Sequence, residues 1–201
     1  MFTTYKCFGK DDYNKLVRFK ELEGGQDILN EATEITEKII RLMVTPLCRR
    51  DCEFCCNKQY SIADVPTVSD EELQRAEVLC LTGGEPFVFT DPCNIAQYYR
   101  RIYRNIRKVY VYTNAFELAD WIDDGNRIHD INGLSISIKT ESDAFFFQKY
   151  IENEPDICSL PSNRLYVFHG LYTGKPKGFE VIHREWQEVF KPANDSIFRR
   201  L

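Results

Sequence analysis

The stretch IIRLMVTPLCRRDCEFCC, residues 39–56, decides how the rest of the chain is interpreted. It opens with a short apolar run suited to a buried strand, and a loop rich in cysteine follows directly. Further short apolar runs recur downstream, at residues 78–82, 109–113, 134–139 and 165–169. Each of these runs has the length and composition of a strand, so the chain is predicted to contain a series of buried strands.

Helix-start signals separate the predicted strands. They are a Ser69 and Glu72 capping box, Thr90 or Asp91 before Pro92, Asn114 with Glu117, and Thr140 with Asp143. Apolar residues at helical spacing over residues 182–190 predict one more helix near the end of the chain. The chain therefore alternates strand and helix along most of its length.

This alternation predicts an α/β fold with a parallel sheet and right-handed crossovers. A complete eightfold barrel needs about 250 residues, whereas this chain has 201. We therefore expect an open, partial βα barrel with about five to six parallel strands. The chain is interpreted as a single domain over residues 1–201, with an N-terminal extension over residues 1–35 and the partial barrel over residues 36–201.

The composition limits the compartment and the partners. Apolar residues make up 43% and charged residues 28%, near the averages of globular proteins. The formal net charge of −5 does not favour nucleic acid as a partner. The chain shows no signal peptide and no apolar run near the ~18 residues of a membrane helix, so we expect a cytoplasmic protein without a membrane partner. In that reducing compartment, clustered cysteines are first interpreted as metal ligands or reactive groups.

The cysteine loop has the spacing C-x3-C-x2-C, formed by Cys48, Cys52 and Cys55, with Phe54 just before the last cysteine. Thiolates at these positions can each hold one iron of a cubane cluster and leave one iron without a protein ligand. Cys56 adjoins Cys55 and is not easily turned toward the same metal, so we interpret it as a packing residue.

These residues resemble the radical S-adenosylmethionine (SAM) superfamily, whose signature is C-x3-C-x-aromatic-C on the loop after the first barrel strand. The resemblance implies a 4Fe-4S cluster bound by Cys48, Cys52 and Cys55 that reductively cleaves SAM to a 5'-deoxyadenosyl radical. That radical abstracts hydrogen from the substrate. The resemblance also implies an external one-electron reductant, such as a flavodoxin or ferredoxin-like protein, and it places Phe54 beside the adenine of SAM.

A second stretch, LTGGEP at residues 81–86, is similar to the GGE motif that meets the methionine part of SAM in that family. Gly83 and Gly84 allow the backbone to bend and to approach a ligand closely, and Glu85 adds a negative acceptor for an ammonium group. Together with Pro86 they are predicted to bind SAM. Both motifs follow strands, so both belong to the carboxyl edge of the sheet, where ligands bind in such folds.

Two further strand ends are candidate parts of the SAM site. VYTNA at residues 111–115 is similar to the TNG-type turn of the family, with Ala115 in place of the usual glycine, and it makes Thr113 and Asn114 candidates. An N-cap role explains Asn114 equally well. Ser135 and Ser137 are candidates at the end of the next strand.

Lys139 and His169 are the candidate catalytic residues. Lys139 alternates with the two serines, so it can point into the barrel with them. His169 is predicted at the carboxyl end of a later strand, where it can transfer a proton or contact the substrate. A surface cation and a hydrogen-bonded structural histidine are the respective alternatives.

The substrate class stays open between a peptide or protein and a small molecule. The compact chain resembles glycyl-radical activating enzymes, which act on a partner protein, and deazaguanine-forming members, which use a small pterin. A hypothesis from another class is a non-catalytic iron-sulfur or zinc-binding module of a partner complex. In that case Cys56, Cys80 or a histidine would complete a tetrahedral zinc site.

Overall fold

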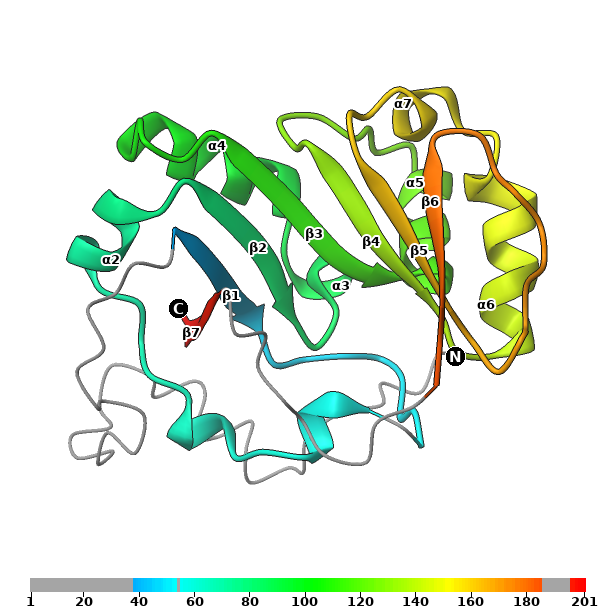
Figure 1. Ribbon diagram of the computed structural model, residues 1–201, viewed down its shortest axis with the longest axis horizontal. Coiled ribbons are helices and arrows are strands. Elements are labelled where there is room, and N and C mark those ends of the chain that lie inside the picture. The colour runs from blue at the N-terminus through cyan, green and yellow to red at the C-terminus, as the bar shows by residue number, and fades with distance from the viewer. Residues whose placement is uncertain (1–37, 54, 186–195) are drawn as a thin grey trace.

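The computed structural model describes residues 38–53, 55–185 and 196–201. Within them lies one open sheet of seven parallel strands in the order β6-β5-β4-β3-β2-β1-β7 (Figure 1). The strands are β1 (Ile39–Thr45), β2 (Val78–Gly83), β3 (Lys108–Asn114), β4 (Gly133–Ile138), β5 (Asn163–Phe168), β6 (Phe179–Arg184) and β7 (Ile197–Arg200). The predicted open, parallel α/β sheet is confirmed, with more strands than the five or six expected.

Five of the six described α-helices begin after a residue whose side chain caps them, and the last one does not. The helices are α2 (Asp70–Arg75), α3 (Pro86–Phe89), α4 (Pro92–Ile102), α5 (Ala115–Asp123), α6 (Glu141–Phe146) and α7 (Pro155–Cys158), with 3-10 turns η1 (Cys56–Lys58) and η2 (Ile62–Asp64) and a π-helical turn η3 (Phe147–Ile151). Ser69 with Glu72 and Thr140 with Asp143 form capping boxes, and Asp91 and Asn114 are N-caps. The predicted starts of α2, α4, α5 and α6 are therefore confirmed.

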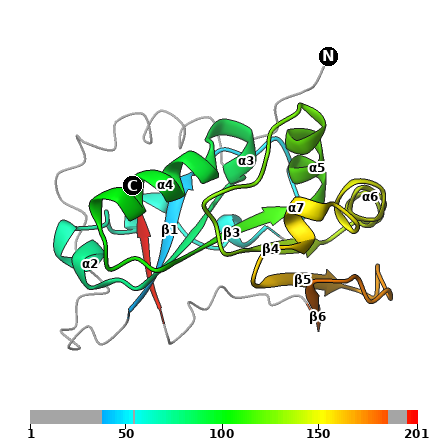
Figure 2. The same cartoon turned by 90° about the horizontal axis from the view of Figure 1, so that it is seen from above.

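The order of the strands explains why the helices gather on one side. Strands β1 to β6 lie beside one another in chain order, so each right-handed crossover moves in the same direction. Figure 2 shows α3 to α6 on one side of the strands. This singly wound arrangement is that of an opened barrel, with the helices outside and the other face of the sheet turned inward.

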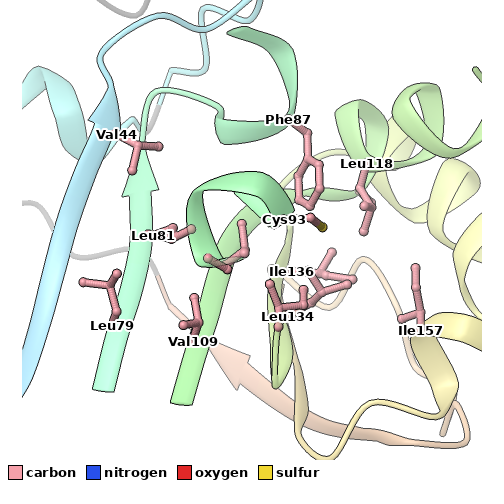
Figure 3. Close-up of a cluster of buried hydrophobic side chains, with 14 of the residues drawn as sticks. Val44, Leu79, Leu81, Phe87, Cys93, Val109, Leu118, Leu134, Ile136 and Ile157 are labelled. Carbon is pink, nitrogen blue, oxygen red and sulfur yellow. The ribbon is translucent and has the colours of Figure 1, made fainter. Parts of the chain in front are cut away.

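The alternation of side chains divides the strands between these two faces. Leu42, Leu81, Val109 and Ile136 face the helices and join a buried cluster with residues from every described α-helix (Figure 3). Met43 points the other way and belongs to a second cluster. We call that second side of the sheet the open face, and it is where the predicted barrel interior would be.

The end of the chain differs from the prediction. Ile182 lies in strand β6, so the helix expected over residues 182–190 does not begin there; the rest of that segment lies outside the described residues. β7 pairs in parallel with β1, and no sequence pattern had suggested that strand. The expected N-terminal extension, residues 1–35, also lies outside the described residues. In the described part of the chain, no helix is long and apolar enough to cross a membrane.

Candidate functional site

The glycine turn after β2 is hydrogen-bonded to the segment that leads into the cysteine loop. The amide of Gly84 donates to the carbonyl oxygen of Thr45 and the amide of Glu85 to that of Leu47, both at 2.7 Å. A Cβ atom on Gly84 would lie 2.0 Å from the Leu47 carbonyl oxygen. Gly83 has φ +132°, and a Cβ atom there would lie 2.0 Å from the Thr45 oxygen. Glycine is therefore required at both positions for this contact between backbones.

A second link returns to the same turn from beyond the last cysteine. The side-chain amide of Asn57 donates to the carbonyl oxygen of Gly83 at 2.7 Å, and the Tyr60 hydroxyl donates to Asn57 Oδ1. Asn57 is buried, at 5% exposure. The cysteine loop is therefore fastened to the glycine turn at both of its ends. Asn57 was not among the predicted site residues, because nothing in the local sequence pattern marks it as a partner of the turn.

The cysteines of the loop lie together on the open face. Cys48 and Cys55 are buried in one cluster with Met43 and Ile62, and Cys52 packs against that cluster. Burial raises the pKa of the Cys52 thiol above its usual value, while the nearby charges of Arg50 and Lys139 act in the opposite direction. Nearby cations stabilise the thiolate, which is the form of cysteine that binds iron.

The donor atoms fit an iron-sulfur cluster in kind and in location. Cys48, Cys52 and Cys55 lie on one loop and in one cluster of side chains, beside positive charge. Among the described residues, however, no group of three or more histidine, cysteine, aspartate or glutamate side chains is arranged to hold a metal ion.

Two arginines of the loop, Arg49 and Arg50, attach it to the helices beyond the neighbouring strands. Arg50 forms an ion pair with the buried Asp143 and donates to Thr140 Oγ1 at 3.1 Å, next to the start of α6. Arg49 donates to Asp120 of α5 at 2.8 Å. Neither arginine was among the predicted site residues; the only local signal was their position between Cys48 and Cys52. Their contacts hold the loop across the carboxyl edge of the sheet.

Glu85 joins the ends of β2 and β3. Only 2% of the residue is exposed. One carboxyl oxygen accepts from the Thr113 hydroxyl at 2.6 Å and the Phe87 amide at 3.3 Å, and the other accepts from the Asn114 amide at 3.0 Å and side-chain amide at 2.7 Å. Burial outweighs these donors and raises the pKa of Glu85 to about 8. Its hydrogen bonds all go to its own chain, so contact with a ligand ammonium stays a prediction.

Thr113 and Asn114 belong to the same hydrogen-bond network around Glu85. Thr113 is buried at 6% exposure. Asn114 Oδ1 accepts from the amide of Glu117 at 2.9 Å, so Asn114 is the N-cap of α5. The N-cap role that the sequence offered as the alternative for Asn114 is therefore confirmed. The return bond of a capping box is missing, because the Asn114 amide donates to Glu85 instead. Direct contact of Thr113 or Asn114 with SAM stays a prediction.

Of the remaining candidates, Lys139 lies near the cysteine loop. Ser135 and Ser137 lie on the open face, and Ser137 is beside Asn114 in the sheet. The positive charge of Lys139 acts to lower the pKa of the Cys52 thiol, against the effect of burial. His169 follows β5, one strand further along, with φ +51°, an exposed side chain and Nδ1 at 3.9 Å from Glu185. The structure therefore brings Lys139 near the loop, places Ser137 beside Asn114, and leaves His169 one strand further away.

Pro86 and Phe54 complete the set of predicted residues. Pro86 is buried at the first position of α3, directly after the glycine turn. Phe54 lies outside the described residues, so its predicted place beside adenine stays a prediction. A scan against protein-family models and a search of curated proteins both found no match to this chain.

Proposed function

We propose that this protein is a radical SAM enzyme. The observation that supports it best is the contact between the cysteine loop and the glycine turn, through the bonds from Gly84 to Thr45 and from Asn57 to Gly83. Two motifs that are separate in the sequence thus form one unit at the carboxyl edge of a parallel sheet, where such folds bind ligands. A structural zinc site would not require a glycine turn packed against its loop.

In this proposal Cys48, Cys52 and Cys55 hold a 4Fe-4S cluster, and the turn from Gly83 to Pro86 binds the methionine part of SAM. Once bound and reduced, cluster and SAM would supply a 5'-deoxyadenosyl radical that abstracts hydrogen from the substrate. The chain's own task is to position both groups and to balance their charge. Lys139 contributes to that balance, since its charge acts on Cys52.

The substrate would approach over the open face. Arg41 of β1 lies on this face, where its guanidinium donates to the Tyr112 hydroxyl at 3.0 Å and to Ser196 Oγ at 2.9 Å. The ring of Tyr166, on β5 of the same face, lies 4.6 Å from the Arg184 guanidinium carbon. A face with hydroxyl, aromatic and cationic groups can contact either a peptide or protein or a polar small molecule, so both substrate classes are retained in the proposal.

Anaerobic reconstitution with iron and sulfide tests the proposal. We expect a brown protein with about four iron and about four sulfide per chain and a broad absorption near ~400 nm. Dithionite, or a flavodoxin or ferredoxin-like reductant, should then convert added SAM to 5'-deoxyadenosine. Protein that binds stoichiometric zinc, takes up no iron and leaves SAM intact would contradict the proposal and favour a non-catalytic module.

A further inference from the structure

A hollow lies among the helices, on the side of the sheet opposite the open face. It has a volume of about 370 Å³ and is lined by residues of α3, of α5 and of the cysteine loop. This size lies within the range of pockets that bind small ligands. The residues that matter for its chemistry are Arg49, Phe87, Glu117, Asp120, Trp121 and Asp124.

Glu117 is the unusual member of this lining. The residue is 1% exposed, and neither of its carboxyl oxygens has a hydrogen-bond partner. The backbone amide of Asn114, which a capping box would direct to Glu117, donates to Glu85 instead. The nearest cationic atom is Arg49 Nε at 3.7 Å, which is beyond a hydrogen bond. A buried carboxyl group in this state is costly unless a ligand completes its bonding.

The other charged residues of the lining also favour a bound cation. Asp91, Asp120 and Asp124 add three carboxylates to that of Glu117, and Arg49 is the cation among the residues that line the cavity. Arg49 is already engaged with Asp120 at 2.8 Å. The carboxylates of the lining therefore outnumber its cation, so an incoming positive charge would be attracted.

Aromatic rings complete the cavity. Phe87 and Trp121 line it together, with their ring centres 5.0 Å apart and their planes tilted by 59°. The faces of such rings attract organic cations and cover their methylene groups. A metal ion would find fewer ligands, because no group of three or more metal-binding side chains is found among the described residues. The combination favours an organic cation over a metal ion.

We propose that this cavity binds an alkylammonium or guanidinium group, with Glu117 as the principal counter-ion and Trp121 as the packing surface. The group can belong to a free amine or to a basic side chain of a peptide, since both present the same chemistry. The proposal does not depend on radical SAM activity, because the cavity is formed by the chain itself on the side of the sheet that carries the helices.

The test is an NMR titration of the full chain, following the indole N–H of Trp121 with butylammonium, agmatine and a blocked glycyl-arginyl-glycine peptide. We expect saturable shifts with a dissociation constant on the order of 1 mM or tighter for a cation, and none for butanol. Agmatine binding without peptide binding would identify a free amine as the source, and tighter peptide binding would identify a basic side chain.

Three variants decide the role of the carboxylates. Glu117→Gln keeps the shape of the side chain and should weaken cation binding by about 10-fold, and Asp124→Asn at the exposed rim should weaken it by about 3-fold. Asp123→Asn removes the same charge from the same helix outside the lining and should leave binding unchanged. Asp124→Asn keeps the test valid if Glu117→Gln folds poorly. Equal binding by all three variants, or no saturable binding of any cation, would overturn the proposal.

Discussion

Replacing Cys48, Cys52 or Cys55 with alanine is expected to lower the formation of 5'-deoxyadenosine by about two orders of magnitude or more. Each thiolate would hold its own iron, so loss of one ligand leaves a second iron of the cluster without a protein ligand, and such a cluster is not expected to survive. The measurement is the iron and sulfide content of anaerobically reconstituted variants, followed by the yield of 5'-deoxyadenosine with dithionite and SAM.

The chain offers matched controls for this series. Cys158→Ala removes a thiol at α7, far from the loop in the order of the sheet, and Cys56→Ala removes the neighbour of Cys55. Both should retain the cluster and the activity. Full activity in any one of the Cys48, Cys52 and Cys55 variants would show that this residue is not a ligand. Loss of activity in Cys56→Ala together with retention in Cys55→Ala would exchange the assignment of these neighbours.

The second large effect concerns folding. Glu85→Ala is expected to lower the free energy of unfolding by about 3–5 kcal/mol, because it leaves a cavity and removes the shared acceptor of Thr113 and Asn114. Glu85→Gln should cost much less. Its amide can donate to Thr113 Oγ1, whose hydroxyl then donates to the Asn114 carbonyl, 3.1 Å away. Urea denaturation of both variants measures the difference, and equal losses would contradict this account.

The same carboxyl group predicts a dependence of stability on pH. Burial raises the folded-state pKa of Glu85 from the ordinary value of 4.5 to about 8. Between these values the folded chain holds a proton that the unfolded chain has released, so this contribution to stability is complete below pH ~4.5 and is lost as the pH rises toward 8. Glu85→Gln cannot titrate and should remove this slope. An identical slope in wild type and variant would assign it to other groups.

Much of the fold could be predicted because it depends on local patterns. The run Ile39–Thr45 matches strand β1 residue for residue, since an apolar segment between turns has no better place than a buried strand. Capping residues such as Ser69 and Thr140 mark helix starts because their side chains bond to the backbone three residues on. For strands that follow one another in chain order, the right-handed crossover rule then places the connecting helices on one side of the sheet.

The parts that could not be predicted depend on contacts between distant segments. Ile182 fits either helical or strand spacing, and it forms part of strand β6 because this segment pairs with β5. Asn114 and Glu117 have the spacing of a capping box, yet Glu85 from the preceding strand end takes the amide. The partners of Arg49 and Arg50 lie more than 60 residues away. None of these contacts leaves a mark within its own stretch of sequence.

The central claim is that the cysteine loop and the glycine turn bring a cluster and SAM into contact. Electron paramagnetic resonance of the reduced, reconstituted protein tests it most directly, with SAM carrying ¹⁵N in its methionine amino group. The account predicts that SAM alters the signal of the cluster and that pulsed spectra show coupling between the cluster and the labelled nitrogen. A cluster signal that SAM leaves unchanged, with no such coupling at saturating SAM, would contradict it.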